Sequence, residues 1–290
     1  MEINGCTRTC GLIGNPVEHT LSPVIHHFLA EKLDVDLAYV PFLVQKESLG
    51  EAVKGAYALN LLGLNVTVPY KSDVIPYLCE VDELAGRIGA VNTLVRTEKG
   101  YKGYNTDMPG LFRAMQSDDV KLAGERVIVL GAGGVARAVV MMLATKGAKE
   151  IIILNRTLER AEKIAEEVNA IAGRKLVRTM VLSAFGELPE GEKYLAIQAT
   201  NVGMYPNTEE VILRDKAFYR RIHTGYDLIF NPADTMFMKL VRESGGRSFN
   251  GLKMLLYQGV IAFELWTRKV VADKNADQLY RIMLEKMQEK

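Results

Sequence analysis

Short apolar runs alternate with segments of helical patterning along the whole chain. In the first third, β-branched runs predict strands, and apolar residues three or four positions apart predict helices between them. The predicted strands are Thr9–Asn15, Leu37–Val44, Leu62–Val68 and Val91–Arg96, and the predicted helices are Pro23–Leu33, Ser48–Leu59 and Ser72–Cys79. This alternation indicates strand-helix-strand units around largely parallel sheets, so the predicted fold class is α/β.

A second series of the same kind begins with the apolar strand Arg126–Leu130. A glycine-rich turn and a helix follow it, then the apolar run that leads to Asn155, and then an Ala/Glu/Lys-rich helix. Further strands are predicted at Tyr194–Gln198 and Tyr226–Phe230, and this is the element order of a dinucleotide-binding domain. The chain then turns helical through Lys253–Lys269 and Asn275–Lys290, with no strand left to pair with the second sheet.

The chain length suits two domains, because single hydrophobic cores stop growing at roughly 250 to 300 residues and this chain has 290. We expect residues 1–107 and 252–290 to form one α/β domain, with the last helices packed back on the first sheet. Residues 108–251 are expected to form a Rossmann domain. The boundaries are predicted in short segments near Asp107–Gly110 and Gly251, and the cleft between the domains is the expected active site.

Composition narrows the class of function. The formal net charge is +1 and there is no long basic run, so a small-molecule partner is expected and neither nucleic acid nor a membrane. No run approaches the roughly 18 apolar residues of a membrane span, and the N-terminus is too polar for a signal peptide, which predicts a cytoplasmic protein. The sequence does not determine the oligomeric state, and we expect a monomer or a homodimer. The three cysteines and four histidines lack ligand spacing, so we assign no metal and expect reduced, structural thiols.

A glycine motif of the form G-x-G-x-x-A directly follows the strand that ends at Leu130 and opens the predicted helix Val135–Lys146. Such a motif provides a tight turn, close approach of the backbone to a pyrophosphate, and a helix N-terminus whose free N–H groups face the phosphates. Glycines alone also serve ordinary turns. The strand, the glycines and the helix together predict cofactor binding by Gly131, Ala132, Gly133, Gly134, Val135 and Ala136.

The strand after the glycine motif ends in Asn155, Arg156 and Thr157. NAD-specific domains place an Asp or Glu near this position to bind the ribose 2′-hydroxyl. An arginine instead suits a 2′-phosphate, through charge-assisted hydrogen bonds worth about 1.5 to 3 kcal/mol each, so NADP is favoured over NAD. The plainer alternative, in which Thr157 only caps the helix Leu158–Asn169 and Arg156 is solvated, is compatible with this role.

Five further segments resemble the signatures of the shikimate dehydrogenase family and occur in the family's order. They are Gly14–Pro23, Asn65–Lys71, Gly89–Thr93, Asn105–Asp107 and Gln258–Leu265. Together with the glycine motif, Asn155–Thr157, Gln198–Met204 and Asp227–Thr235, the resemblance covers essentially the whole chain. It implies reversible reduction of 3-dehydroshikimate to shikimate with NADPH, in the biosynthesis of chorismate and aromatic amino acids.

The resemblance implies that Lys71 and Asp107 flank the reacting C3 oxygen, where an ammonium group stabilises the developing alkoxide and can deliver a proton. Which of the two carries the proton at each step stays open. The resemblance assigns the substrate carboxylate to Thr20 and Ser22, although Ser22 is equally well interpreted as a helix N-cap before Pro23. The neutral groups expected to select the ring hydroxyls are Thr67, Asn92 and Gln258.

The resemblance also places the nicotinamide end of the cofactor near Ala199, Thr200, Met204, Leu228, Gly251 and Met254, and Glu83 is included among the cofactor-binding residues. Taken singly, Met204 and Leu228 could be ordinary core residues. The blander interpretation of Lys71 and Asp107 is a structural ion pair.

Two positions depart from the family pattern. Many members carry Tyr at the position of Phe230, so one substrate hydrogen bond on the order of 0.5 to 1.5 kcal/mol is missing, and quinate becomes a conceivable substrate. Thr20 replaces the commoner Ser and adds a methyl group. The competing hypotheses are a quinate/shikimate dehydrogenase that uses NAD, which Arg156 disfavours, and a non-catalytic NADP-binding regulator, which the intact pair of Lys71 and Asp107 disfavours.

Overall fold

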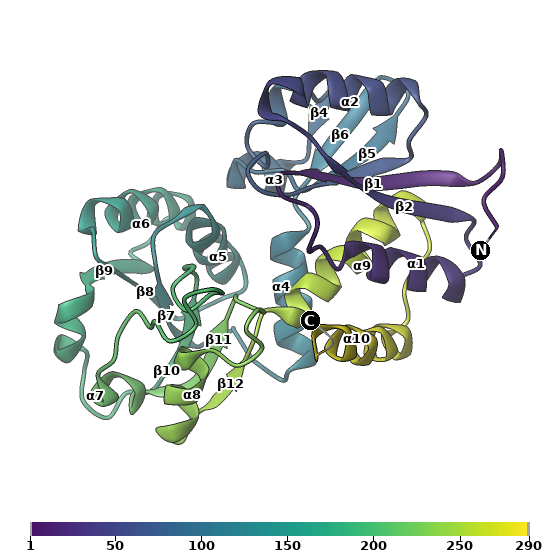
Figure 1. Cartoon of the computed structure of the whole chain (residues 1–290). Coiled ribbons are helices and arrows are strands. Elements are labelled where there is room, and N and C mark those ends of the chain that lie inside the picture. Colours follow the sequence, from purple (N-terminus) through teal and green to yellow (C-terminus); the bar gives the residue numbers. More distant parts are fainter. Residues whose placement is uncertain (1, 289–290) are drawn as a thin grey trace. The chain divides into compact units, whose positions relative to one another are not determined.

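The computed structural model describes residues 2–288. It divides into two compact units, shown with their sheets and helices in Figure 1. Unit 1 combines the residues up to Leu111 with those from Leu255 onward, and unit 2 is Phe112–Met254. The boundaries predicted from the sequence lie within about one helical turn of these positions, and the assignment of each unit to a substrate or a cofactor domain stays a prediction.

Unit 1 is built on a six-stranded mixed sheet of order β2-β1-β3-β5-β6-β4. The strands are β1 Arg8–Gly14, β2 Leu37–Leu43, β3 Gly63–Val66, β4 Glu80–Val81, β5 Thr93–Thr97 and β6 Gly100–Tyr104. β1 runs parallel to β2 and β3, whereas β5 is antiparallel to both β3 and β6. The sheet is largely parallel, as predicted, since β4 runs parallel to β6 and five of the six strands share one direction. The exception is β5, which is reversed because a hairpin at Glu98 and Lys99, and not a crossover helix, joins it to β6.

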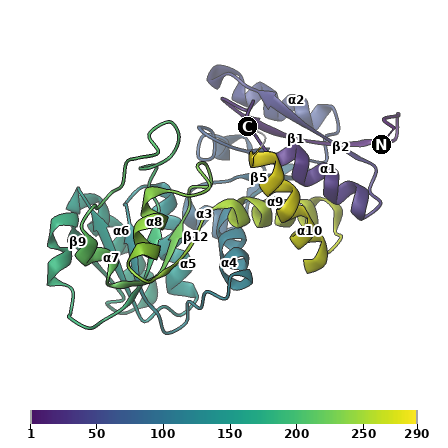
Figure 2. The ribbon, with the colours of Figure 1, turned by 60° about the horizontal axis from the view of Figure 1, so that its bottom comes forward.

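Helices cover both faces of this sheet. The helices are α1 Ser22–Lys32, α2 Leu49–Ala58, α3 Glu83–Ile88, α4 Asp107–Ser117, α9 Leu252–Thr267 and α10 Asp273–Gln288. Two of them cross a unit boundary: α4 continues past Leu111 into unit 2, and α9 begins before Leu255 in unit 2. Figures 1 and 2 show α2 on one face and α1, α9 and α10 on the other. Under α2, the side chains of Leu49 and Val53 join a buried cluster with Val66 and Leu94 of the sheet, so apolar burial on both faces holds the strand ends in place.

One helix predicted in unit 1 is wrong. The helix predicted at Ser72–Cys79 forms only a short 3-10 turn at Ile75–Tyr77, because Pro76 has no N–H to donate and disfavours the helical conformation before it. The segment Asp107–Gly110, near which a domain boundary is predicted, forms the first turn of α4. Asn105 Oδ1 accepts the N–H groups of Asp107 at 3.1 Å and Met108 at 3.3 Å, which satisfies two free donors at the helix start.

Unit 2 contains a parallel six-stranded sheet of order β12-β11-β10-β7-β8-β9. Its strands are β7 Arg126–Leu130, β8 Glu150–Asn155, β9 Val177–Val181, β10 Tyr194–Gln198, β11 Ile222–Asp227 and β12 Arg247–Phe249, and its helices include α5 Gly134–Thr145, α6 Leu158–Ala172, α7 Lys216–Tyr219 and α8 Met236–Glu243. Read from β9, this is the strand order of the Rossmann fold, as predicted. Residues 151–154 of β8 are completely buried, which is typical of a parallel strand covered on both faces.

The strand predicted at Tyr226–Phe230 in unit 2 is wrong at both ends, since β11 spans Ile222–Asp227. Its start at Ile222 was missed because His223, Thr224 and Gly225 do not form an apolar run. It ends at Asp227 because the carboxylate of this residue accepts the N–H of Ile229 at 3.0 Å, which turns the chain out of the ladder.

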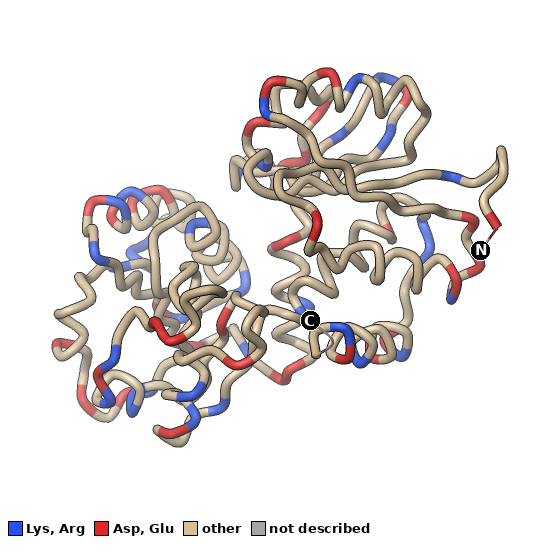
Figure 3. Tube along the Cα trace, viewed as in Figure 1, with Lys and Arg blue, Asp and Glu red and all other residues tan. Residues whose placement is uncertain are grey.

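The remaining features of the described residues concern membrane-spanning helices, metal ligands, charge and cysteines. Within residues 2–288 no helix has the length and apolar character needed to cross a membrane, and no group of three or more His, Cys, Asp or Glu side chains among them could hold a metal ion. Lys and Arg alternate with Asp and Glu over each unit in Figure 3. All three cysteines are free thiols; Cys10 is buried, whereas Cys6 and Cys79 are exposed.

Gly63 of β3 tests the packing of unit 1. A Cβ at this position would lie 2.1 Å from Nε1 of Trp266, whose indole donates to the carbonyl of Leu94. We expect Gly63→Ala to lower the free energy of unfolding by about 1 to 3 kcal/mol through overpacking, measured by urea denaturation. The matched control is Gly55→Ala in α2, where nothing lies within 4 Å of the added carbon; it should be neutral or stabilising. Equal stability of the two variants would contradict this account.

Candidate functional site

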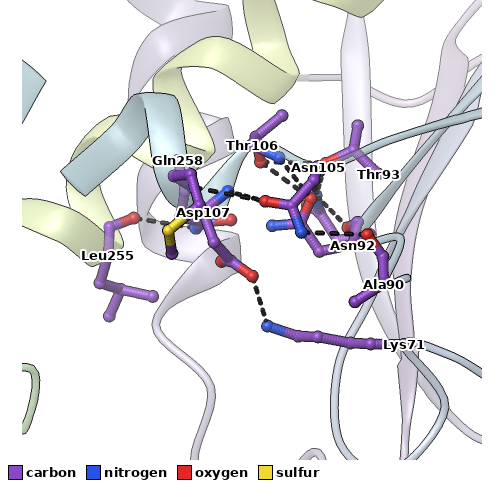
Figure 4. Close-up of polar contacts among 11 residues, drawn as sticks. Lys71, Ala90, Asn92, Thr93, Asn105, Thr106, Asp107, Leu255 and Gln258 are labelled. Atoms are coloured by element: carbon purple, nitrogen blue, oxygen red, sulfur yellow. Dashed lines mark hydrogen bonds and ion pairs between the residues drawn. The ribbon is translucent and has the colours of Figure 1, made fainter. Parts of the chain in front are cut away.

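Lys71 and Asp107, the pair predicted to be catalytic, meet within unit 1 (Figure 4). Lys71 Nζ lies 2.7 Å from Asp107 Oδ2, and the two side chains are 33% and 17% exposed, so a ligand can reach both. The backbone of Lys71 is held after β3, because its carbonyl accepts the N–H of Val91 at 2.7 Å. The neighbouring Tyr70 hydroxyl donates to the carbonyl of Val44 at 2.7 Å. A charged pair is thus presented on a fixed backbone.

Asp107 stands in the first turn of α4. The partial positive charge of a helix N-terminus favours a carboxylate there. α4 also approaches α9 closely, since a Cβ on Gly110 would lie 2.7 Å from the backbone nitrogen of Gln258. Gln258 Nε2 donates to the carbonyl of Leu255 at 2.8 Å. Glycine at position 110 therefore lets the helices that carry Asp107 and Gln258 pack side by side, as Figure 4 shows.

Asn92 lies behind the charged pair and is 3% exposed. Its Oδ1 accepts the backbone N–H of Thr106 at 2.7 Å, the Thr106 hydroxyl at 3.2 Å and the Thr93 hydroxyl at 3.1 Å. Sequence reasoning did not single out Thr93, Thr106, Asn105 or Asn65, all of which surround Asn92. Asn105, Thr106 and Asp107, followed by Pro109, form a recognisable helix-start pattern that could have indicated α4.

Thr20 and Ser22 adjoin each other where α1 begins. The Thr20 hydroxyl donates to Ser22 Oγ at 3.1 Å, and the Ser22 N–H donates back to Thr20 Oγ1 at 3.2 Å. The interpretation of Ser22 as an N-cap is wrong: Leu21 holds that position, and Ser22 is the first helical residue. Thr67 follows β3, half-buried, and its methyl group occupies the space where a Cβ on Gly14 would be, 2.3 Å away. These hydroxyls belong to unit 1 with Lys71.

The glycine motif forms the turn from β7 into α5 in unit 2. Gly131 has a φ of +111°, and a Cβ there would lie 2.6 Å from Thr200 Cγ2, so both conformation and space require glycine. Gly133 and Gly134 are exposed, and nothing lies within 4 Å of a Cβ added at either position, while Ala136 is buried. The N-terminus of α5 therefore opens onto free space where phosphates can approach its N–H groups.

Ala199 and Thr200 follow β10 beside Gly131. Since β7 and β10 are adjacent where the strand order reverses, this is the usual nucleotide position of such sheets. Gln198, which the sequence analysis did not assign to the site, holds the loop: its Oε1 accepts the N–H and the hydroxyl of Thr200, both at 2.7 Å, and its Nε2 donates to the carbonyl of Val202 at 3.0 Å.

Arg156 is exposed at the end of β8 and forms no hydrogen bond or ion pair with any of residues 2–288. Asn155 Nδ2 donates to the carbonyl of Thr157 at 2.8 Å. Thr157 takes the N-cap position of α6, yet its hydroxyl makes no capping hydrogen bond. An uncommitted guanidinium and a free hydroxyl thus stand together one strand away from the glycine turn, and the donors present suit a phosphate group.

The remaining residues predicted at the nicotinamide end also lie in unit 2. The N–H of Leu228 donates to the carbonyl of Gln198 at 3.1 Å, and that of Gly251 to Ile229 at 2.9 Å. A Cβ on Gly251 would lie 2.2 Å from the Leu228 carbonyl oxygen. Met204 is 45% exposed and is therefore no core residue. The partly buried Leu228 and Met254 complete this set.

Two predicted site residues belong to a different unit from the other residues of the same predicted site. Phe230, predicted at the substrate, belongs to unit 2, whereas the other substrate residues belong to unit 1. Glu83, predicted at the cofactor, lies in α3 of unit 1, where it accepts a hydrogen bond from Arg87 at 2.5 Å. The other predicted cofactor residues all belong to unit 2.

Asp227 is a buried carboxylic acid that anchors the loop carrying Leu228 and Phe230. It accepts the N–H of Ile229 at 3.0 Å and the hydroxyl of Thr235 at 2.7 Å, so one side chain ties both ends of this loop. Burial raises the pKa of Asp227 to about 7, although the two hydrogen bonds act in the opposite direction. Folding therefore favours the protonated form over much of the acid range.

The raised pKa of Asp227 makes the stability depend on pH. The protonated acid contributes stability that is complete below the unfolded pKa of 3.8 and is lost as pH rises through about 7. We expect the free energy of unfolding of the wild type, relative to Asp227→Asn, to fall by about 2 to 3 kcal/mol between pH 5 and pH 8. Urea unfolding at both pH values measures this. Asp234→Asn, at an exposed acid of the same loop, should show no such change, and a constant difference for Asp227→Asn would disprove the account.

The chain matches three family models. The shikimate dehydrogenase substrate binding domain matches residues 12–94, the shikimate/quinate 5-dehydrogenase model matches residues 113–181, and the shikimate 5′-dehydrogenase C-terminal domain matches residues 251–273. A curated shikimate dehydrogenase (NADP(+)) from Carboxydothermus hydrogenoformans is 42% identical over 269 residues, which cover 92% of this chain and 94% of that protein.

Solved structures extend the similarity to the fold. Shikimate 5-dehydrogenase from Listeria monocytogenes, in complex with shikimate and NAD, is 33% identical with a TM-score of 0.89, covering 98% of each chain. Shikimate 5-dehydrogenase from Thermus thermophilus, in complex with NADP(H) and shikimate, is 32% identical with a TM-score of 0.82, covering 94% of this chain and 98% of that chain.

Proposed function

The chain belongs to the shikimate dehydrogenase family, whose members reduce 3-dehydroshikimate to shikimate with NADPH, and we propose that it performs this reaction with Lys71 and Asp107 at the reacting oxygen. The reaction is reversible and lies on the route to chorismate and the aromatic amino acids. The observation that carries the proposed catalytic assignment is the 2.7 Å contact between Lys71 Nζ and Asp107 Oδ2 on accessible side chains.

The proposed roles of the pair follow from charge. When NADPH is bound it supplies a hydride, and the ketone oxygen of 3-dehydroshikimate gains negative charge as its carbon is reduced. The Lys71 ammonium group stabilises that charge and supplies the proton that completes the alcohol. Asp107 orients the lysine through the 2.7 Å contact between Lys71 Nζ and Asp107 Oδ2. In the reverse direction the same pair removes the proton from the C3 hydroxyl.

The proposed substrate contacts surround this pair in the same unit. The adjoining hydroxyls of Thr20 and Ser22 can both donate to a carboxylate without introducing a fixed charge. Thr67, Asn92 and Gln258 supply neutral hydrogen-bonding groups for the ring hydroxyls, and an analogue lacking a hydroxyl would leave them unpaired. Phe230, predicted at the substrate, belongs to unit 2, and its phenyl ring has no polar group that could hydrogen-bond to a substrate.

The proposed cofactor is NADP, held by unit 2. The N-terminus of α5 with Gly133 and Gly134 provides the pyrophosphate site, supported by the open space in front of both glycines. Arg156, with Asn155 and Thr157, provides the site of the 2′-phosphate. Thr200, Met204, Leu228, Gly251 and Met254 are proposed for the nicotinamide end. The assignment of Glu83 to the cofactor stays a prediction, and its position in α3 of unit 1 does not support it. The cytoplasmic location and the oligomeric state also stay predictions.

Lys71→Ala tests the catalytic assignment. We expect the turnover number to fall by about a hundredfold or more, because the charge and the proton at the C3 oxygen are lost, with binding of NADPH near normal. Steady-state kinetics and fluorescence titration of NADPH measure the two effects. Lys102→Ala is the matched control, since Lys102 also pairs with a carboxylate, Glu80, in unit 1. Near-full activity of Lys71→Ala would remove Lys71 from the mechanism.

Initial rates with NADP⁺ or NAD⁺ and with shikimate or quinate test cofactor and substrate choice. We expect shikimate with NADP⁺ to be fastest in the wild type. Arg156→Ala should raise the KM for NADP⁺ by about tenfold or more and leave that for NAD⁺ almost unchanged, because one charge-assisted contact to the 2′-phosphate is lost. Arg220→Ala, at another exposed arginine of unit 2, should change neither. Quinate with NAD⁺ fastest would favour the catabolic alternative, and no turnover in any combination would favour a regulator.

A further inference from the structure

A chain of hydrogen bonds runs through the interior of unit 1 to Asn92. It joins six side chains that are at most 4% exposed, and we call this set the Asn92 network: His26, Tyr39, Asn65, Asn92, Thr93 and Thr106. Buried polar groups of this kind need partners of the right polarity, because a buried donor that faces another donor is costly. The direction of each hydrogen bond can therefore be followed from residue to residue.

Asn65 of β3 has an amide orientation that its neighbours dictate. The backbone carbonyl of Asn92, which can only accept, lies 3.3 Å from Asn65 Nδ2, and Thr93 Oγ1 lies 3.1 Å from the same nitrogen. Asn65 and Thr93 are directly opposite each other in the antiparallel pair of β3 and β5. Both hydrogens of the Asn65 amide are thus used, and one of them is donated to the Thr93 hydroxyl.

The opposite side of Asn65 is held by two rings. The Tyr39 hydroxyl donates to Asn65 Oδ1 at 2.8 Å, and His26 Nε2 lies 3.2 Å from the same oxygen. His26 and Tyr39 stack with their centroids 4.2 Å apart. Burial lowers the pKa of His26 to about 3, so at neutral pH the imidazole is neutral and only one of its two nitrogens carries a hydrogen. Nε2, which faces Asn65 Oδ1, is that nitrogen. Two donors fix Oδ1 on this side.

Thr93 links Asn65 to Asn92 through its hydroxyl group, which accepts from one amide and can donate to the other. Because its oxygen accepts from Asn65, its single hydrogen is left for Asn92 Oδ1 or for the Thr106 hydroxyl, each at 3.1 Å. The backbone N–H of Thr106 can only donate, and it lies 2.7 Å from Asn92 Oδ1. The buried end of the Asn92 amide is therefore its oxygen. Asn92 Nδ2 forms no hydrogen bond with any of residues 2–288, so both of its hydrogens are free.

We propose that Asn65 and Thr93 are positioning residues that hold the Asn92 amide in this orientation, so that Asn92 meets the substrate only as a hydrogen-bond donor. This inference rests on the proposed function, in which Asn92 contacts a ring oxygen. The substrate oxygen that faces Asn92 Nδ2 must therefore accept a hydrogen bond, and the hydrogen of that hydroxyl must be donated to another group. Gln258 is complementary, since its Nε2 is committed to the carbonyl of Leu255 and its Oε1 is left to accept.

Thr93→Val tests the positioning role, because it keeps the shape of the side chain and removes the hydroxyl. We expect the KM for shikimate to rise by about tenfold with kcat changed less than threefold, since the lost contact binds ground state and transition state alike. Thr93→Ser keeps the hydroxyl and should restore the KM to within about twofold of the wild type. An unchanged KM in Thr93→Val would overturn the proposal.

A general loss of stability is separated by Tyr101→Phe, which removes another buried hydrogen bond of unit 1, from the Tyr101 hydroxyl to the carbonyl of Leu61 at 2.9 Å. This control should lower the melting temperature as Thr93→Val does and leave the KM unchanged. An equal rise in KM in Tyr101→Phe would mean that Thr93 acts only through stability, and it would overturn the proposal.

Variants of Asn92 separate the inference from the proposed function. In an Asn92→Ala background, Thr93→Val should raise the KM no further, because its effect passes through Asn92; additive effects would overturn the positioning role. Asn92→Asp replaces the free donors by an acceptor, so its KM should exceed that of Asn92→Ala, and a lower one would refute the donor-only orientation. If Asn92→Ala itself leaves the KM unchanged, the assignment of Asn92 to the substrate fails, and the inference falls with it.

Discussion

The backbone N–H of Thr106 donates to Asn92 Oδ1 at 2.7 Å, and the geometry of unit 1 depends on this hydrogen bond. It joins the chain that leaves β6 to the chain that enters β5, at the place where α4 begins. Because Asn105 caps α4 from the same segment, the bond also sets where Asp107 stands and therefore where its carboxylate meets Lys71. One buried hydrogen bond thus links the neutral and the charged parts of the site.

The two units meet their ligands with different chemistry. Unit 2 offers backbone N–H groups at a helix start, which carry a partial positive charge and suit phosphates of any nucleotide, and it adds selectivity through the single cation Arg156. Unit 1 offers side-chain amides and hydroxyls whose donor or acceptor character is fixed by buried neighbours. Such groups distinguish ring oxygens, since a mismatched partner leaves a buried polar group unpaired. In both units a side-chain amide fixes its surroundings: Gln198 holds the loop at Thr200 and Val202 in unit 2, and Asn65 holds the Thr93 hydroxyl in unit 1.

Much of the fold was predictable because its elements are periodic and long. The apolar strands β1, β7 and β8 and the helices α5 and α9 follow directly from the pattern. The misses have local physical causes. β6 is Gly- and Tyr-rich and is recognisable only as the partner of β5, α4 begins with polar capping residues, and Pro76 prevents the helix expected at Ser72–Cys79. Ser22 was expected to cap α1, but the Thr20 hydroxyl takes its N–H instead.

The sequence by itself determined the class of fold, the family, the glycine turn at Gly131 and the cation at Arg156, because each depends on contiguous residues whose local conformation or charge is sufficient. Only the tertiary structure decided the orientation of the Asn92 amide and the contact between Lys71 and Asp107. Asn65 and Thr93 meet because β3 and β5 pair in an antiparallel register, and Lys71 meets Asp107 because α4 starts beside that pair. Such relations follow from strand pairing and burial between distant segments, which no local pattern encodes.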